Sequence, residues 1–300
     1  MTDVIMVGTV ALDSVKTPFG EVEETLGGSA VYASVAASTF ARVGLVGVVG
    51  RDFPERHIAF LREKGVDLDG LEIADGDSFR WKGYYEYDMN QAHTLDTRLN
   101  VLSQFNPKLP KAYRDARYVF LANTDPEIQM NVYDQINNPK LVMLDTMNFW
   151  IENKKDALSR VIEKVDVMLT NDAEARQFFG TPNLIKAGRA FLEMGPKAVI
   201  IKKGEHGAIL FTGDQCFVAP AYPLENLVDP TGAGDSFAGG FIGWLAKTDD
   251  VSPRNMRKAV VFGSIVASYN AEDFSLNKLK TITHEDIFNR YMMFQDIASF

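Results

Sequence analysis

From about residue 115 onward, short apolar runs alternate with longer amphipathic segments. The runs predict buried strands at residues 118–121, 141–144, 165–169 and 198–201, and helix-like segments near residues 126–136, 150–164 and 172–194 separate them. Strands and helices in this rhythm form βαβ units, so we expect a mostly parallel sheet covered by helices. Two closing helices are predicted at residues 237–246 and 253–271, the second beginning at Pro253.

The first hundred residues follow this rhythm only in part. Residues 4–12 and 43–49 read as strands and residues 29–41 as a helix. Between them, Phe79, Trp81, Tyr85 and Tyr87 alternate with charged residues, which predicts a strand with one aromatic and one charged face. Together with the polar stretch around residues 15–24, this predicts a small sheet that stands off the main domain. A sheet of this size needs a partner surface to be stable, and the plainest partner for its aromatic face is the main domain.

Composition and charge narrow the class of protein. The 300 residues, 46% of them hydrophobic, can bury one large α/β core, and we expect one domain over residues 1–300. Cys216 is the only cysteine, which excludes an intrachain disulfide and favours a structural thiol. The four histidines show no metal-ligand spacing, and only His93 lies near the predicted small sheet.

The charge pattern bears on partners and location. A net charge of −9 disfavours binding to nucleic acid, because that binding relies on basic surface. The N-terminus lacks a basic segment, and the longest apolar runs are far short of the roughly 20 residues that span a bilayer. We therefore expect a cytoplasmic protein that contacts neither membranes nor nucleic acid.

The candidate chemistry lies in the stretch Asp229-Pro-Thr-Gly-Ala-Gly-Asp235, which runs into an apolar helix-like segment. The free N–H groups of Ala233, Gly234 and Asp235 would point out of a helix N-terminus toward negative charge. Asp235 would stand in the first helical turn and could accept a proton from a nearby hydroxyl. The stretch therefore predicts phosphoryl transfer to an alcohol; the plain alternative is a loop with a helix-capping acid.

Other phosphate-binding and catalytic motifs are absent from the chain. None of its 23 glycines is followed by lysine, so there is no P-loop. Gly232 and Gly234 are followed by Phe237 where a dinucleotide fingerprint needs its third glycine, which leaves a nicotinamide-dependent oxidoreductase as a weak alternative. Gly27-Gly28-Ser29-Ala30-Val31 is no nucleophile elbow, and the zinc-protease motif is missing after His284.

The stretch from Asp229 to Ile242 resembles the C-terminal signature of the PfkB family of carbohydrate and nucleoside kinases. The resemblance extends over nearly the whole chain, since Gly47, Gly50 and Asp52 match the family's Gly-x-Val-Gly-x-Asp segment. It implies a ribokinase-like three-layer α/β/α core with a mostly parallel central sheet. It also implies a small β-sheet lid, formed here by insertions near residues 14–26 and 77–100, that often serves as a dimer contact.

The resemblance also implies the residues that bind the acceptor and perform catalysis. Asp13 matches the aspartate that accepts hydrogen bonds from two sugar hydroxyls, and Gly27 and Gly28 match the hinge pair between lid and core. Asp235 becomes the catalytic base that activates a substrate hydroxymethyl group. The amides of Gly232, Ala233 and Gly234 become the anion hole.

On the donor side, the resemblance implies ATP and Mg²⁺. Asn171 and Glu174 match the Asn-x-x-Glu motif, in which the glutamate organises Mg²⁺ through water; an ordinary capped helix start explains the same pattern. The residues that match nucleotide-contacting positions of the family are Lys202, Gly204, Gly207 and Thr231. If the register shifts by one residue, Lys203 takes the place of Lys202. Some family members hold a monovalent cation at the positions of Asp229 and Thr231, which raises the question of a K⁺ site.

The acceptor is the least determined part of this interpretation. Tyr32 stands where many sugar kinases of the family place an asparagine, so a usual contact to a sugar hydroxyl is missing or supplied otherwise. We expect a small sugar as acceptor, with a nucleoside as the alternative because an aromatic lid could stack on a base. A catalytically idle sensor of nucleotide or sugar is more remote, since Asp235 and its glycines are intact.

Overall fold

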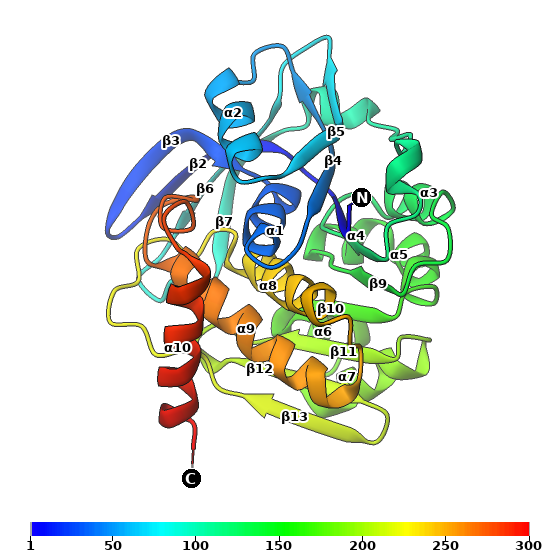
Figure 1. Cartoon of the computed structure of the whole chain (residues 1–300), viewed down its shortest axis with the longest axis vertical. Coiled ribbons are helices and arrows are strands. Elements are labelled where there is room, and N and C mark those ends of the chain that lie inside the picture. The colour runs from blue at the N-terminus through cyan, green and yellow to red at the C-terminus, as the bar shows by residue number, and fades with distance from the viewer. Residues whose placement is uncertain (1, 300) are drawn as a thin grey trace.

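A nine-stranded sheet forms the centre of the computed structural model, which describes residues 2–299 (Figure 1). The strand order is β13-β12-β11-β10-β9-β8-β1-β4-β5. All neighbours from β5 to β11 pair in parallel, and β12 and β13 add an antiparallel edge. The strands are β1 (Val4–Val7), β4 (Val43–Gly50), β5 (Asp67–Ala74), β8 (Tyr118–Leu121), β9 (Leu141–Leu144), β10 (Val167–Asn171), β11 (Ala198–Lys202), β12 (Ala208–Thr212) and β13 (Gln215–Ala219).

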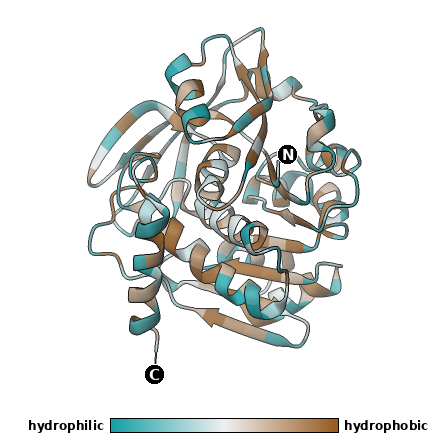
Figure 2. Cartoon of the chain, in the orientation of Figure 1, coloured by the Kyte–Doolittle hydropathy of each residue, from teal (hydrophilic) through white to brown (hydrophobic). Residues whose placement is uncertain are grey.

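Helices cover both faces of this sheet because its strands are apolar on both sides (Figure 2). In β1, Ile5 and Val7 pack with Phe191 on one face, while Val4 and Met6 pack with Phe241 on the other. The first face carries α3 (Pro126–Tyr133), α4 (Asn148–Asn153), α5 (Lys155–Ile162), α6 (Asp172–Phe179), α7 (Leu184–Glu193) and the 3₁₀ turns η1 (Asn100–Gln104) and η2 (Lys111–Tyr113). The second carries α1 (Ser29–Ser38), α2 (Glu55–Glu63), α8 (Ala233–Thr248), α9 (Pro253–Ala271) and α10 (His284–Ile297). The predicted three-layer α/β/α core is confirmed.

A second, four-stranded sheet stands at one side of the molecule (Figure 1). Its order is β3-β2-β6-β7, with β2 and β6 parallel and the outer pairs antiparallel. Its strands are β2 (Ala11–Thr17), β3 (Gly20–Gly27), β6 (Phe79–Tyr85) and β7 (Ala92–Arg98). They come from the two segments in which the sequence predicted a small sheet, near residues 14–26 and 77–100. We call this element the small sheet.

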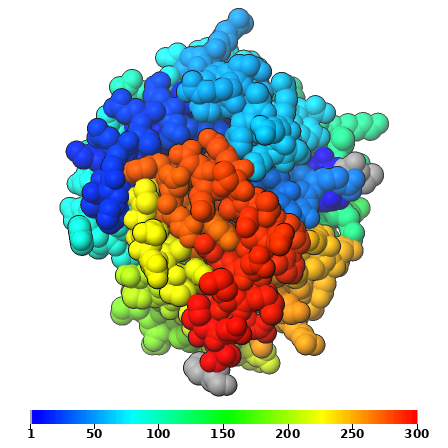
Figure 3. Space-filling view, turned by 60° about the vertical axis from the view of Figure 1, so that its left-hand side comes forward, coloured from blue at the N-terminus to red at the C-terminus, as the bar shows by residue number. Residues whose placement is uncertain are grey.

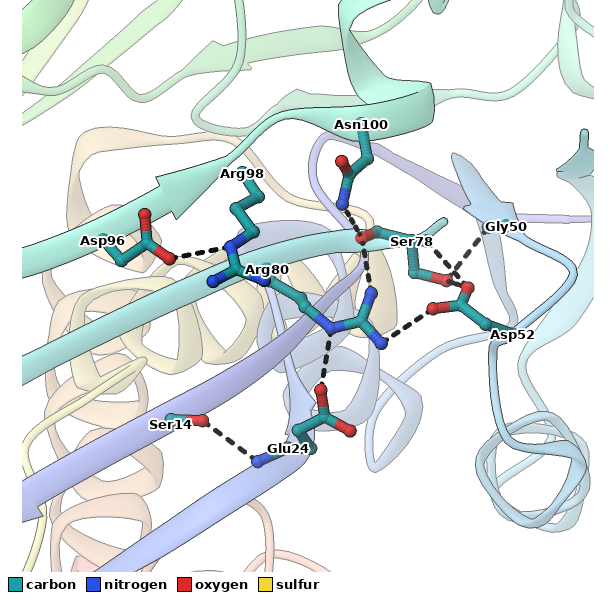
Figure 4. A network of polar contacts seen from close by, with 9 residues as sticks. All are labelled: Ser14, Glu24, Gly50, Asp52, Ser78, Arg80, Asp96, Arg98 and Asn100. Atoms are coloured by element: carbon teal, nitrogen blue, oxygen red, sulfur yellow. Dashed lines mark hydrogen bonds and ion pairs between the residues drawn. The ribbon is translucent and has the colours of Figure 1, made fainter. Parts of the chain in front are cut away.

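An arginine of the small sheet ties it to the main sheet (Figure 4). The guanidinium of Arg80 lies 2.7 Å from Asp52, which follows β4, and 2.7 Å from Glu24 of β3. The other carboxylate oxygen of Asp52 accepts hydrogen bonds from both the N–H and the hydroxyl of Ser78, each 2.7 Å long. The Ser78 hydroxyl oxygen in turn accepts from the N–H of Gly50. The Gly-x-Val-Gly-x-Asp segment is thus the joint between the two sheets.

Several predicted elements were wrong in extent. The expected strand at residues 4–12 is two strands in different sheets, because Thr9 leaves the ladder and exchanges hydrogen bonds with Ser29 at the start of α1. The expected helix at residues 150–164 breaks at Lys154, whose ammonium binds two carboxylates at the start of α3. The expected helix at residues 172–194 breaks after Gly180, which ends α6 in the left-handed conformation.

Some elements were not predicted at all: β5, α2, β12, β13 and α10. α10 and the segment that precedes it lie on the surface (Figure 3). Cys216, which we expected to be a structural thiol, is a free thiol exposed on β13. Within residues 2–299, no helix is both long and apolar enough to cross a membrane.

Candidate active site

The glycine-rich turn opens α8, as the sequence predicted. Gly232 is the N-cap of the helix and has a φ of 76°, a left-handed conformation that favours glycine. The ring of Tyr32 lies flat against it: a Cβ on Gly232 would stand 2.4 Å from ring atoms. Ala233, Gly234 and Asp235 then form the first turn. The N–H of Ala233, which we expected to be free, donates a hydrogen bond of 3.0 Å to the carbonyl oxygen of Pro230, so the N–H groups of Gly234 and Asp235 are the ones that the helix start leaves for a ligand. The turn therefore offers an anion-binding nest backed by an aromatic ring.

The carboxylate of Asp235 is poised to titrate near neutral pH. Burial and the nearby charge of Asp145 raise the pKa of Asp235 to about 7, and the ammonium of Lys202 opposes them. The side chain is nevertheless partly open to solvent, so a ligand can reach it. A carboxylate with a pKa near the working pH is well suited to exchange a proton with a substrate hydroxyl.

A buried ion pair stands beside the turn. The Nζ of Lys202, at the end of β11, lies 2.6 Å from a carboxylate oxygen of Asp145, just past β9. The same Nζ lies 3.2 Å from the point where a Cβ of Gly234 would stand. Burial works against the ammonium, but Asp145 and Glu174 outweigh it and raise the pKa of Lys202. A fixed positive charge therefore faces the anion-binding turn.

Asn171 and Glu174 form a capping box at the start of α6. The Asn171 side chain accepts a hydrogen bond from the N–H of Glu174 (2.8 Å), and Glu174 Oε2 accepts from the N–H of Asn171 (2.8 Å) and from the hydroxyl of Thr170 (3.0 Å). Burial and the charge of Asp145 raise the pKa of Glu174 to about 7. Among residues 2–299, no hydrogen-bond donor engages Oε1 of Glu174, which leaves this oxygen for a cation or its water.

The predicted nucleotide turn follows β11 as the 3₁₀ turn η3 (Gly204–His206). Gly207 ends it with a φ of 79°, and a Cβ there would lie 2.0 Å from the carbonyl oxygen of Ala219 on β13. Asn90, in the loop between β6 and β7, donates a hydrogen bond of 3.2 Å to Glu205. The tip of the small sheet thus contacts this turn directly.

Asp13 and the glycine pair Gly27 and Gly28 meet where the small sheet joins the core. A Cβ on Gly27 would lie 1.8 Å from an oxygen of Asp13, and one on Gly28 would lie 2.4 Å from the carbonyl oxygen of Thr9. Both glycines are therefore required by close approach. Burial raises the pKa of Asp13 to about 7, and the charges of Asp229 and Asp235 add to this rise. Asp13 and Asp235 thus share one electrostatic environment.

The small sheet presents aromatic residues on the same side as Asp13. Trp81 pairs with Asp13 in the β2–β6 register, and paired residues project from one face of a sheet. Tyr85 follows on that face, and its hydroxyl accepts a hydrogen bond of 3.4 Å from Thr231. His93 lies on the opposite face, stacked on Tyr84 with ring centroids 4.9 Å apart. Trp81 and Tyr85 therefore border the region between Asp13 and the glycine-rich turn, and His93 does not.

Asp229 and Tyr32 lie deeper than the sequence suggested. Asp229 is fully buried, and its carboxylate oxygens accept hydrogen bonds from the N–H groups of Thr231 (2.9 Å) and Ser275 (3.2 Å). Tyr32 is 1% exposed, and within residues 2–299 its hydroxyl has no hydrogen-bond partner. Tyr32 thus supports the anion-binding turn from beneath.

Sequence reasoning gave no role to Asp145 or Tyr85. Asp145 follows a short buried strand at the carboxyl edge of a parallel sheet, which is where ligands bind in such folds, and this position was an available signal. Tyr85 belonged to a recognised aromatic alternation, but the partner of its hydroxyl depends on a contact across 146 residues.

Comparison with known proteins identifies the fold family. The sequence model of the family described as "pfkB family carbohydrate kinase" matches residues 1–281 of this chain. The chain belongs to the PfkB family. A cytidine kinase of Thermococcus kodakarensis is 30% identical over 249 residues, which cover 81% of this chain and 88% of that protein.

Two solved structures of nucleoside kinases share the fold of this PfkB chain. The nucleoside kinase of Methanocaldococcus jannaschii aligns with a TM-score of 0.78 at 20% identity and covers 98% of this chain and 99% of that one. The nucleoside kinase of Burkholderia thailandensis in complex with inosine has a TM-score of 0.77 at 18% identity, covering 97% and 98%. These likenesses establish the ribokinase-like architecture, and the activity of the chain is that of a PfkB kinase, which transfers phosphate from ATP to a sugar or nucleoside.

Proposed function

We propose that this PfkB kinase phosphorylates a hydroxymethyl group of a ribonucleoside, with a pyrimidine ribonucleoside such as cytidine as the first candidate. The sequence alone favoured a small sugar with a nucleoside as the alternative. The similarity to a cytidine kinase over 88% of that protein's length reverses this order and is the observation that carries the proposal. Trp81 and Tyr85 support it, because they share the face of Asp13 and offer ring surfaces to a base.

In the proposed reaction, Asp235 accepts the proton of the substrate hydroxyl. The hydroxyl oxygen forms a bond to the γ-phosphorus of ATP, and the bond between this phosphorus and the oxygen of the departing ADP breaks. The amides of Gly232 and Gly234 stabilise the charge on the transferring group, and that of Ala233 joins them if it gives up its hydrogen bond to Pro230. Asp13 accepts hydrogen bonds from the ribose hydroxyls, and Gly27 and Gly28 permit the small sheet to move as a lid. The geometry that supports these roles is the common face of Asp13 and Trp81 on the small sheet, together with the hydrogen bond from Thr231 to Tyr85 beside the glycine-rich turn.

The donor side is proposed from the arrangement around Lys202. Lys202 exchanges its contact with Asp145 for the phosphates of ATP, a change that its position beside Gly234 favours. Mg²⁺, when bound, neutralises phosphate charge, and Glu174 holds it through water. Gly204, Gly207, Asn171 and Thr231 are proposed to border the nucleotide.

The test measures ADP release from MgATP with cytidine, uridine, adenosine, inosine, ribose and fructose as acceptors. Turnover with a nucleoside at a kcat/KM at least tenfold above that of the free sugars supports the proposal, and preference for a free sugar refutes it. Asp235→Asn should lower kcat by a factor on the order of 10² or more with KM within several-fold. Asp249→Asn is the matched control, because Asp249 is the C-cap of the same helix and binds Lys140 at 2.8 Å.

Two further variants distinguish the neighbouring lysines. Lys202→Met should raise KM for ATP and lower kcat by a factor on the order of 10², whereas Lys203→Met should change both by less than threefold. Binding of a nucleoside and ATP without turnover, seen by calorimetry, would instead favour the idle sensor.

The assembly and location are part of the proposal. A dimer through the small sheet and a cytoplasmic location remain predictions. The face of the small sheet opposite Asp13 carries Ser14, Lys16, Arg80 and Lys82 together with Leu12 and Tyr84, so it is mostly polar with some apolar surface. Light scattering of the purified protein tests the dimer: a mass of twice 33.4 kDa supports it, and a mass of 33.4 kDa excludes it.

A further inference from the structure

The end of α9 lies directly behind the anion-binding turn. The N–H groups of Val228 and Asp229 both point at the carbonyl oxygen of Ala271, at 2.9 and 3.3 Å. Residues 228–232 therefore rest on residues 270–275, although about forty positions of chain separate them. Backbone hydrogen bonds therefore join the end of α9 to the segment that leads into the turn.

Asn270 holds both ends of the turn. Its side-chain amide donates a hydrogen bond of 2.7 Å to the carbonyl oxygen of Thr231, immediately before Gly232. Its Oδ1 accepts one of 3.2 Å from the hydroxyl of Ser236, immediately after Asp235. Asn270 is 0% exposed, so water does not compete for either bond. The Asn270 side chain is thus hydrogen-bonded to the residues on either side of the segment that carries the anion-binding amides and the proposed base.

Ser275 continues the same connection toward the small sheet. It is 2% exposed and has a φ of 55°, which is uncommon for a residue other than glycine. Its N–H donates to Asp229 at 3.2 Å, and its hydroxyl donates to the carbonyl oxygen of Leu26 at 2.6 Å, just before Gly27. The strained backbone is therefore held by bonds to the turn and to the joint of the small sheet.

These contacts engage the oxygens that would bind a monovalent cation. Asp229 already accepts from the N–H groups of Thr231 and Ser275, and the Thr231 carbonyl accepts from Asn270. A carbonyl or carboxylate oxygen has a second lone pair, so these hydrogen bonds do not by themselves exclude a cation; they do supply, from protein groups alone, contacts that hold these oxygens in place. At the position where a K⁺ site was in question, the turn is therefore already held by hydrogen bonds from Asn270 and Ser275.

We propose that Asn270 is a positioning residue for phosphoryl transfer and that it and Ser275 replace a monovalent cation in ordering the anion-binding turn. The proposal rests on the kinase activity of the chain and not on which acceptor it uses. It makes two separate claims: loss of the Asn270 amide displaces the turn, and the wild-type protein responds to K⁺ no more than to other monovalent cations.

The test of the first claim compares Asn270→Asp with Asn255→Asp. Asn255 is a suitable control because it is a buried asparagine of the same helix whose amide donates to Thr248 and Asp250 and whose Oδ1 accepts from Trp244. Asn270→Asp should lower kcat on the order of 10²-fold while KM for ATP and acceptor changes only several-fold, because a misplacement of about 1 Å costs that much. Asn255→Asp should keep kcat within threefold at a similar loss of melting temperature. Equal kcat values for the two variants at matched melting temperatures overturn the claim.

If Asn270→Asp does not fold, Ser236→Ala removes only the bond to Oδ1. It should lower kcat about tenfold with no more than a small change in KM. An unchanged kcat in this variant would overturn the claim that Asn270 positions the turn through its bond to Ser236. Each variant is compared with the wild-type protein, using the acceptor of the panel that the wild type turns over best. If no acceptor is turned over, the proposed function fails, and only the claim about K⁺ can then be tested.

The second claim is tested on the wild-type protein freed of K⁺. Turnover and melting temperature are measured in equal concentrations of potassium, sodium and choline chloride. Turnover within twofold and melting temperatures within about 1 °C support the replacement of the cation. Stimulation by K⁺ of fivefold or more, or a K⁺-specific rise in melting temperature, overturns it, and the melting curves give this answer whether or not the acceptor is known.

Discussion

Gly232 allows a sharp test of how the anion-binding turn is built. In Gly232→Ala, the new methyl group would stand 2.4 Å from the ring of Tyr32, and the residue would keep a φ of 76°. The left-handed backbone costs about 1–2 kcal/mol for a residue with a Cβ. Overpacking against a buried ring adds about 1–3 kcal/mol. We therefore expect a total loss of about 2–5 kcal/mol and, because the amides move, a fall in kcat on the order of 10²-fold.

Gly180→Ala is the matched control for the backbone part of this cost. Gly180 has a φ of 62° and nothing within 4 Å of an added Cβ, so only the left-handed penalty applies. The difference between the two variants isolates the contact with Tyr32. Combining Gly232→Ala with Tyr32→Ala should be less than additive, since the double variant removes the clash.

The assay is thermal unfolding followed by circular dichroism, where each kcal/mol corresponds to roughly 2–4 °C in a chain of this size class. Steady-state kinetics with MgATP accompany it. If Gly232→Ala and Gly180→Ala lower the melting temperature equally, the contact between Gly232 and Tyr32 does not constrain the turn. Wild-type kcat in Gly232→Ala would refute the reasoning about the amides.

Three further predictions concern pH, Mg²⁺ and the joint between the sheets. Because the pKa of Asp235 is about 7 and the base must be ionised, kcat/KM should rise with pH to a plateau above about 7. Asp145→Asn removes a negative charge that raises this pKa, so the rise in kcat/KM should move to lower pH by roughly one unit. An unchanged pH profile in this variant would contradict the assignment of Asp235 as the base. Glu174→Gln should raise the Mg²⁺ concentration at half-maximal rate by about tenfold or more, measured by titration of chelated enzyme, whereas an unchanged midpoint would remove Glu174 from the metal site. Arg80→Met breaks the contacts with Asp52 and Glu24 and should raise KM for the acceptor about tenfold. Arg98→Met is the control: it breaks an exposed ion pair with Asp96, and its KM should stay at the wild-type value.

The sequence predicted the parts of the fold that rest on local pattern. The buried strands at residues 118–121 and 141–144 are continuous apolar runs, and both match the structure at the predicted bounds. The strand β5 was missed because it is only partly buried and carries Asp67, Asp69 and Glu72, which obscure an apolar pattern. Its place at the sheet edge explains this composition, since one side faces solvent.

The site was predictable where one segment carries the function, and less so where distant segments meet. The glycine-rich turn and Asp235 stand in one stretch of chain, and Asp235 lies in the first turn of α8 as expected, although the helix begins at Ala233 and not at the predicted residue 237. The pair of Asp145 and Lys202 joins two strands that flank β10, across 57 positions of sequence. Asn270 gave no sequence signal at all, because a single asparagine in an amphipathic helix has no pattern to distinguish it.

Trp81 gives the molecule an optical reporter of its own. It lies on the Asp13 side of the small sheet, and its indole N–H donates a hydrogen bond of 3.1 Å to Thr94 within the same sheet. The other two tryptophans, Trp150 and Trp244, belong to α4 and α8 of the main body. Replacing those two with phenylalanine would leave one fluorophore that moves with the small sheet. Its emission would follow closure over an acceptor in real time, without any attached dye.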